Sequence, residues 1–198
     1  MASEEVIVPF REDVVPLRAG RSTLLVSAQS VFRVDGTFER YAANLPDDTR
    51  DAVLHMVVGD WLPTEVLLAH YRACDALGLS QRQAAEYGRT VLGKTRETWM
   101  GTMALVAREA GATPWTLIEQ FQRFWDRAYQ GGAIRVVKTG PKDARCEVVE
   151  VPLCDVAYYR HATLGLIAAT LELFTRKAYV SQVPFRSPGA MTFRMQWA

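Results

Sequence analysis

Cysteine and histidine are scarce in this sequence, and their spacing excludes the sites most often built from them. The 198-residue chain has three residues of each type. Cys74, Cys146 and Cys154 are far apart and include no Cys-x-x-Cys pair, so they fit neither a disulfide framework nor a zinc cluster. No two histidines stand at the spacing of a metal-binding motif such as His-Glu-x-x-His. We therefore expect reduced thiols and no metal site.

The sequence also lacks a surplus of one charge and a long apolar run. Its 23 basic and 22 acidic residues give a net charge of +1, with no dense basic block that could bind phosphates. No stretch reaches the roughly 18 apolar residues of a membrane span. Acidic residues stand where a signal peptide would have basic ones. These absences predict a cytoplasmic protein that binds neither nucleic acid nor membrane.

The motifs of common catalytic sites are missing as well. The sequence contains no Gly-x-Ser-x-Gly elbow, no Walker loop and no Gly-x-Gly-x-x-Gly turn. Cys154 and His161 could be drawn as a nucleophile and its base. Seven residues along one helix place them roughly 10 Å apart, however, which is beyond hydrogen-bond reach. The sequence therefore predicts no catalytic residue and favours a non-enzymatic protein.

The composition that is present is that of a folded globular protein, with 49% hydrophobic and 23% charged residues. We expect an N-terminal arm over residues 1–21 and a single α+β domain over residues 22–198. Within this domain, residues 22–130 should be mainly helical, and residues 131–198 should carry the strands.

Helix start signals recur in the N-terminal two-thirds. Pro46 and Pro63 each stand in the first turn of a predicted helix, and Ser80 with Gln83 forms a capping box. From this capping box an apolar stripe continues in steps of three or four residues to Ala110. That stripe predicts one helix of about thirty residues.

Two further segments complete this part of the chain. Residues 22–34, STLLVSAQSVFRV, are rich in apolar and β-branched residues and predict an early strand. Thr113 and Pro114 mark the start of one more helix, which we expect to end at Gly131 and Gly132.

The hydrophobic period changes from 3.6 to 2 after these glycines. AIRVVK and RCEVVEV predict two strands, a helix should follow from Val156 to Arg176, and KAYVSQV and MTFRMQW predict two more strands. Apolar and polar residues alternate in the last strand, as in an antiparallel sheet with one buried face. The expected fold is therefore α+β: a helical N-terminal two-thirds packed on a small antiparallel sheet, which a C-terminal β-β-α-β-β unit forms.

DNA binding is one alternative function. The segment LSQRQAAEYGRTVLGKTRETW has the Ala-x-x-x-Gly spacing of a helix-turn-helix. In that motif apolar residues pack the second helix on the first. Polar residues occupy those positions here: Gln83, Arg89, Lys94 and Glu97. An uninterrupted helical stripe explains the segment better, so DNA binding is not favoured.

Haem binding is another alternative, and one residue argues against it. His161 precedes small and apolar residues on a predicted helix, where an axial ligand could lie. The segment YVSQV, residues 179–183, begins like the Tyr-x-Ser-x-Arg signature of haem nitric-oxide sensors. Val183 stands where the arginine would bind the haem propionates. We therefore expect no cofactor.

Aromatic residues gather in the middle of the chain and on the last predicted helix. Each lies on a helical stripe, so packing in the core is one interpretation. The other is a pocket between the helices and the sheet. On the second interpretation, a small apolar ligand contacts Trp99, Trp115, Phe121, Trp125, Tyr159 and His161.

A stripe of small residues supports a competing hypothesis. Ala162, Gly165 and Ala169 lie on one side of the last predicted helix. Such a stripe allows two backbones to approach closely. The alternative function is therefore an interaction or scaffold protein that forms a homodimer without a ligand.

The chain resembles an uncharacterised bacterial family of about two-hundred-residue proteins, which is abundant as paralogues in myxobacteria. The resemblance lies in the stretch from LPDDTRDAVLHMV to AAEYGR and in YYRHATLGLIAATLELF. It includes a Trp-x-Pro helix start at Trp61 and Pro63 and the ending Phe-Arg-x-x-Trp at Phe193, Arg194 and Trp197. These are packing motifs and imply no activity.

A more distant resemblance joins residues 86–93 and everything after Gly131 to the superfamily of ligand-binding domains in nitric-oxide signalling and Golgi transport. That group includes haem nitric-oxide-binding and vinyl-reductase-type domains. The resemblance implies a helical layer on a small sheet, with a pocket or a dimer surface between them. The expected function is therefore a non-enzymatic, cytosolic small-ligand-binding or sensory module.

Overall fold

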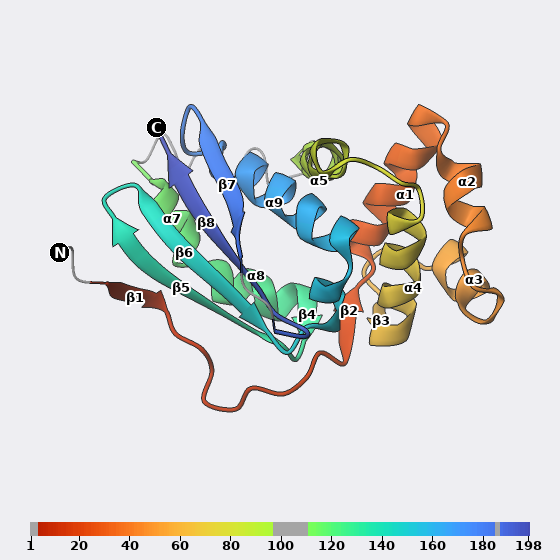
Figure 1. Ribbon diagram of the computed structural model, residues 1–198, viewed down its shortest axis with the longest axis horizontal. Helices are drawn as coiled ribbons and strands as arrows, with labels where there is room; N and C mark the ends of the chain where they lie inside the picture. The colour runs from red at the N-terminus through yellow and green to blue at the C-terminus, as the bar shows by residue number, and fades with distance from the viewer. Residues whose placement is uncertain (1–3, 97–110, 185–186) are drawn as a thin grey trace.

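The computed structural model describes residues 4–96, 111–184 and 187–198 and has the predicted α+β architecture (Figure 1). Helices α1 to α4 form a lobe at one end of the molecule, the main sheet forms the other end, and α9 lies between them. In chain order the elements are β1 (Glu5–Val8), β2 (Ala19–Arg21), α1 (Thr23–Asp35), α2 (Phe38–Ala43), α3 (Asp47–Leu54), β3 (Trp61–Pro63), α4 (Thr64–Asp75), α5 (Gln81–Arg96), α7 (Pro114–Ile118), α8 (Phe121–Ala128), β4 (Tyr129–Gln130), β5 (Ala133–Gly140), β6 (Asp143–Val149), the 3-10 turn η1 (Pro152–Asp155), α9 (Ala157–Leu171), β7 (Ala178–Val183) and β8 (Met191–Trp197).

A five-stranded antiparallel sheet organises the C-terminal part. Its strand order is β1-β5-β6-β8-β7. The predicted β-β-α-β-β unit is confirmed, and β1 joins it as an additional edge strand. Glu5 of β1 lies opposite Lys138 of β5, and their side chains form an ion pair at 3.1 Å. Part of the segment predicted as an arm therefore belongs to this sheet.

The last strand has the predicted buried and exposed faces, with one exception. Phe193 and Trp197 are buried and Arg194 is exposed, but Thr192 is buried as well. Helix α7 covers the buried face at one end, where the Trp115 ring meets the Trp197 ring edge to face with centroids 4.9 Å apart.

The predicted strand over residues 22–34 is wrong, because this segment is helix α1. Its buried residues include Leu25, Ala28 and Phe32, which are spaced by three and four positions. That spacing places them on one helical face. The prediction gave more weight to the β-branched residues of the segment than to this helical spacing. Gly36 ends the helix in the left-handed conformation, with φ of 79°.

The helix predicted to begin at Thr113 is two helices. Thr113 caps α7 and Pro114 is its first residue, as predicted. The chain turns after Ile118, and α8 begins at Phe121. It ends before the glycines, because Tyr129–Gln130 leave the helix to pair with β2.

Other helix ends agree with the prediction in part. The Ser80–Gln83 capping box is confirmed: the Gln83 N–H donates to Ser80 Oγ at 3.3 Å, and the Ser80 N–H donates to Gln83 Oε1 at 2.9 Å. The described part of α5 ends at Arg96, so the predicted continuation to Ala110 lies outside the described residues. Helix α9 ends at Leu171, earlier than predicted.

A second small sheet was not predicted. Its strand order is β3-β2-β4, and each strand has only two or three residues. Such strands are too short to show a period-2 pattern. They tie the start of α1 and the start of α4 to the end of α8.

Helices α5 and α9 cross with their backbones in contact. A Cβ added to Gly88 of α5 would overlap the carbonyl group of Ala162, and one added to Gly165 of α9 would overlap the carbonyl group of Ala85. Only glycine permits this approach at both positions. The crossing fixes α5 on the side of α9 that faces away from the sheet.

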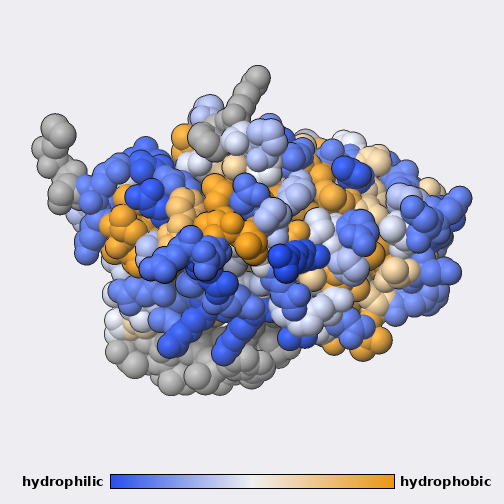
Figure 2. Space-filling model, turned by 90° about the horizontal axis from the view of Figure 1, so that it is seen from below, coloured by the Kyte–Doolittle hydropathy of each residue, from blue (hydrophilic) through white to orange (hydrophobic). Residues whose placement is uncertain are grey.

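Residues 9–18, which connect β1 to β2, run along the lower side of the molecule in Figure 1, the side that Figure 2 views. Figure 2 shows apolar areas on this face that hydrophilic residues interrupt. In the described part of the chain, no helix combines the length and apolar character that a membrane crossing requires.

Candidate functional site

An open groove of about 940 Å³ runs along the outer edge of β7. Helix α5 and strand β7 form its walls, and α9 forms its floor. We call it the α9 groove and define it by Arg82 and Arg89 of α5, Leu164, Gly165 and Ala168 of α9, and β7 with the adjoining Lys177. The glycine-mediated crossing of α5 and α9 builds the floor, because small residues there leave the space above α9 unfilled.

The described lining of the α9 groove is positively charged. Arg82, Arg89 and Lys177 are among its residues, and no described aspartate or glutamate is. Arg82 and Lys177 are exposed. A concave surface with charge of one sign attracts ligands of the opposite sign. The groove therefore favours an anion.

Arg89 is partly neutralised by Glu172, which lies just beyond the end of α9. Arg89 Nη1 is 2.6 Å from Glu172 Oε2. Burial raises the pKa of Glu172, but hydrogen bonds from the Arg89 guanidinium and the Ala178 N–H lower it, and the net pKa lies below its usual value. Glu172 is thus ionised at neutral pH and links α5, α9 and β7.

His161 also lines the α9 groove, at the end nearer the start of α9. Burial lowers the pKa of this histidine, and the neighbouring Arg160 lowers it further. The imidazole is therefore neutral at pH 7. It can donate or accept a hydrogen bond in the groove without adding positive charge.

Among the described residues of the predicted ligand-contact set, His161 is the one that lines the α9 groove. Phe121 and Trp125 are buried, and the Trp125 indole N–H donates to the Gly131 carbonyl at 3.1 Å. Trp99 lies outside the described residues. The role of this set in ligand binding stays a prediction.

Trp115 and Tyr159 occupy two other places. The Trp115 indole N–H donates to the Pro141 carbonyl at 2.9 Å, close to the β5–β6 turn. Tyr159 is buried between the lobe and the sheet, with its ring centroid 4.9 Å from that of Tyr71. Trp125 and Tyr159 both contact Tyr129, through a ring contact and a hydroxyl pair respectively, whereas Trp115 packs against Trp197.

Sequence reasoning missed the α9 groove because its lining comes from three separate segments. The groove residues of α5, α9 and β7 form no short motif, and several are small or polar. Two signals for it were present in the sequence: the glycines Gly88 and Gly165, and an uncharged strand at residues 178–183.

His70 is the centre of a buried polar cluster in α4. Its Nδ1 is 2.6 Å from the Tyr41 hydroxyl, and its Nε2 is 3.7 Å from Cys74 Sγ. Burial lowers the pKa of His70 to about 3. The side chain is only 1% exposed and therefore lies within the core.

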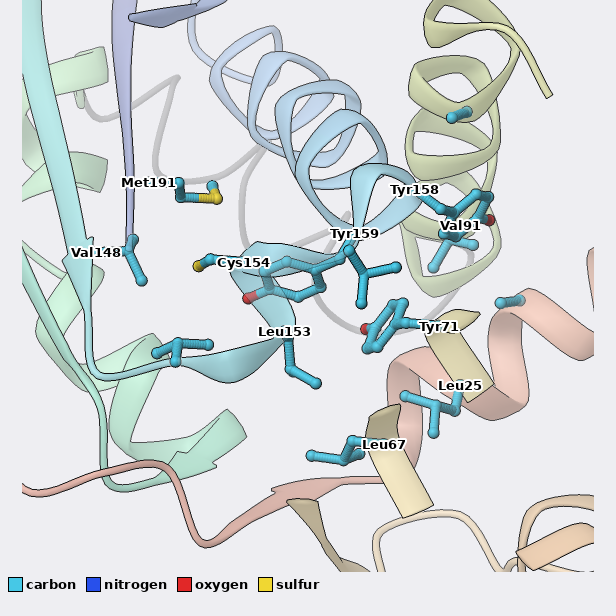
Figure 3. Close-up of a cluster of buried hydrophobic side chains, with 14 of the residues drawn as sticks. Leu25, Leu67, Tyr71, Val91, Val148, Leu153, Cys154, Tyr158, Tyr159 and Met191 are labelled. Carbon is cyan, nitrogen blue, oxygen red and sulfur yellow. The ribbon is translucent and has the colours of Figure 1, made fainter. Parts of the chain in front are cut away.

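The interior between the lobe and the sheet is filled by side chains. Figure 3 shows Tyr71, Tyr158, Tyr159 and Leu153 converging there from α4, α9 and η1. All four are buried. Among the described residues, no group of three or more histidine, cysteine or acidic side chains is placed to hold a metal ion.

Comparison with known proteins places this chain in the context of one family and one fold. A family model described as "Protein of unknown function (DUF2378)" matches residues 60–198. No curated protein matches the chain. The fold that the distant resemblance implied is also that of solved H-NOX structures, described next, and the relation itself stays a prediction. The predicted myxobacterial origin stays a prediction.

Three solved structures illustrate the similarity. The Fe(II) unliganded H-NOX protein from K. algicida is 10% identical, with a TM-score of 0.60 over 90% of this chain and 96% of that chain. An H-NOX mutant from T. tengcongensis is 12% identical, with a TM-score of 0.54 over 89% of this chain and 97% of that chain. An oxygen-binding H-NOX domain related to soluble guanylate cyclases is 12% identical, with a TM-score of 0.55 over 89% and 92%. At these identities the similarity shows the fold alone.

A haem does not fit the described interior of this chain. The space between the lobe and the sheet holds packed tyrosines, and His70 already uses both ring nitrogens within its cluster. His161 lies instead on the α9 groove, which is open to solvent.

Proposed function

The chain belongs to the DUF2378 family, and we propose that it is a non-enzymatic binding module whose ligand occupies the α9 groove. The ligand carries a negative charge together with an apolar part. The proposal keeps the small-ligand-binding or sensory role expected from the sequence, acting in the cytoplasm. It moves the ligand from the aromatic residues to the groove.

The observation that carries the proposal is the combination of groove volume and charge. About 940 Å³ is within the range of ligand sites. The Leu164 and Ala168 side chains offer an apolar floor, and Arg82 and Lys177 supply charge at the walls. An amphiphilic anion satisfies both parts of the surface at once.

The thiols support a non-enzymatic role. Burial raises the pKa of Cys154 to about 12, and the carboxylate of Asp155 raises it as well. Burial also raises the pKa of Cys74 and Cys146. A thiol that stays protonated is a poor nucleophile, so none of the three is suited to covalent catalysis.

Self-association through the small-residue stripe of α9 is not part of this proposal. Gly165, in the middle of the stripe, already contacts the backbone of Ala85 in the same chain. A second copy cannot use the same surface unless α5 moves away.

The fluorescent anion 8-anilinonaphthalene-1-sulfonate tests the proposal, because it has one sulfonate and an apolar ring system. We expect wild type to bind it and the double variant Arg82→Glu with Lys177→Glu to bind it about tenfold more weakly. The matched control is Arg72→Glu with Arg127→Glu, which makes the same change of net charge at two exposed residues outside the groove. Equal binding by both double variants would contradict the proposal. Native mass spectrometry of freshly purified wild type adds a second readout, since a retained ligand appears as extra mass.

A further inference from the structure

Strand β7 ends the main sheet on the side of the α9 groove, because it is last in the strand order. Ala178 directs its N–H away from β8, to Glu172 Oε1 at 3.3 Å, whereas the carbonyl of the preceding Lys177 accepts from the Ala198 N–H at 3.0 Å. In an antiparallel ladder every second residue points outward in this way. The backbone N–H and C=O groups of Val180 and Gln182 therefore face the groove, where no strand adjoins them.

The edge formed by β7 lacks the features that normally protect an edge strand. Its six residues, AYVSQV, include no charge and no proline, and its register with β8 is regular over Ala178–Val183. The opposite edge differs: β1 has four residues, carries Glu5 and has a register shift between Val6 and Val8. Charges and bulges protect edges against the addition of further strands. Only the β1 edge has them.

The floor of the groove is suited to cover one face of an added strand. Neighbouring strands lie about 4.8 Å apart, so a strand beside β7 would run above Leu164 and Ala168 of α9. In such a strand every second side chain would point to this small, apolar floor. The side chains between them would face solvent.

The charges around the edge select the chemistry of the added strand. Arg82 and Arg89 lie on the α5 wall, and Lys177 precedes β7. Glu172 already pairs with Arg89 and accepts the Ala178 N–H at one end of the edge, so the positive charge that remains comes from the exposed Arg82 and Lys177. An acidic segment is therefore favoured over a basic one.

We infer that the α9 groove binds an extended acidic segment of a partner protein, which adds to the main sheet as a strand next to β7. The segment alternates apolar residues, which face the floor, with acidic residues. The inference rests on the proposed function of the groove and narrows its ligand to a peptide held by backbone hydrogen bonds. This is the recognition mode known as β-augmentation.

The test uses fluorescein-labelled peptides of about eight residues, long enough to pair with the whole of β7. One peptide alternates valine with glutamate and the other alternates valine with lysine. We expect the full-length protein to bind the glutamate peptide at least about tenfold more tightly than the lysine peptide in fluorescence anisotropy. Equal binding of the two peptides would overturn the acidic selectivity.

Gln182 provides a matched pair of variants for the backbone contact. Gln182→Pro removes the outward N–H without breaking the ladder to β8, whereas Gln182→Ala removes only the exposed side chain. We expect Gln182→Pro to weaken the glutamate peptide about tenfold and Gln182→Ala to leave its affinity within about twofold of wild type. Equal melting temperatures of the two variants check that the fold is intact.

The outcomes separate this inference from the proposed function. If Gln182→Pro binds the glutamate peptide like wild type while the groove charge reversal still weakens the fluorescent anion, strand addition is wrong and the anion groove stands. If Gln182→Pro does not weaken the glutamate peptide and the groove charge reversal does not weaken the fluorescent anion, both the strand addition and the anion groove are wrong. The edge would belong to a second copy of the chain if wild type is a dimer, Gln182→Pro is a monomer and neither peptide binds. That result would overturn the inference that the groove binds a partner's acidic segment.

Discussion

Gly165 of α9 lies directly against the backbone carbonyl of Ala85 on α5, with no space for a side chain between them. The reciprocal contact of Gly88 with Ala162 makes the crossing nearly symmetrical. Because two backbones touch, this crossing sets the depth of the α9 groove. Stability and binding should therefore depend on the same two glycines.

Gly165→Ala is expected to lower the free energy of unfolding by about 3 kcal/mol, because a methyl group would overlap a carbonyl group that cannot move without the whole helix. Gly88→Ala should have a similar effect. Chemical denaturation measures both. Gly93→Ala is the control: this glycine is exposed on α5 with no atom near its added Cβ, so alanine should stabilise by about 0.5–1 kcal/mol. A neutral Gly165→Ala would show that the two helices are not in backbone contact.

The stability of the protein should fall between pH 6.5 and pH 5 because of His70. Its folded pKa is about 3, against 6.5 for an ordinary histidine, so in this range only the unfolded chain binds the proton. At pH 5 this protonation lowers the free energy of unfolding by about 1.5 kcal/mol relative to pH 6.5. The stabilisation is complete above pH 6.5 and is lost progressively as the pH falls toward 3.

Denaturation curves at pH 6.5 and pH 5 measure this loss. His70→Gln should remove most of the difference between the two pH values, although it destabilises the protein at both. His55→Gln is the control, since His55 is exposed at the end of α3. A pH difference that persists in His70→Gln would assign the titration to another group.

Glu172→Gln should separate stability from binding. The change removes the ion pair with Arg89, in which both side chains are about a third exposed, and lowers stability at pH 7 by about 1 kcal/mol. The folded pKa of Glu172 lies below 4.5, so the difference from wild type should shrink as the pH falls through that folded pKa. The freed Arg89 should also strengthen binding of the fluorescent anion about twofold. Weaker anion binding by Glu172→Gln would contradict a cationic groove.

Purified protein is expected to show no Soret band, even after expression with the haem precursor δ-aminolevulinic acid. The physical reason is the packing of Tyr71, Tyr158 and Tyr159 in the interior. An absorption scan between 350 and 700 nm is sufficient. A band that disappears in His161→Ala would place haem in the α9 groove, and one that disappears in His70→Ala would place it in the lobe.

Local signals predicted much of this fold. The Ser80–Gln83 box, the Thr113–Pro114 helix start and the four C-terminal strands depend on neighbours in sequence, and the structure confirms them. The failure at α1 is also local, since a helical spacing was present and composition was weighed above it.

Other features depend on residues far apart in sequence. The contact that caps α9 is one case: the helix start was predicted to within one residue, but the Tyr158 N–H donates to Asp75 of α4 at 2.8 Å, 83 positions away. The strands β2 and β4 are extended because they pair with each other. No periodicity within either segment could have shown this.

The candidate site was the least predictable part. Aromatic content pointed to Trp115, Phe121 and Trp125, but Trp115 packs against Trp197, Trp125 packs against Tyr129, and Phe121 is buried. The α9 groove is a space that α5, α9 and β7 leave unfilled. No single stretch of sequence shows that such a space will form. His161 belongs to both the prediction and the groove.

The pairing of Glu5 with Lys138 has a consequence for biosynthesis. Strand β1 leaves the ribosome before its hydrogen-bonding partner β5, which is made more than a hundred residues later. Until β5 emerges, the segment EVIV has no strand to pair with, and its apolar residues can be bound by chaperones. Strand β1 therefore pairs long after it is translated, and slow translation before residue 133 would prolong the period in which it is exposed.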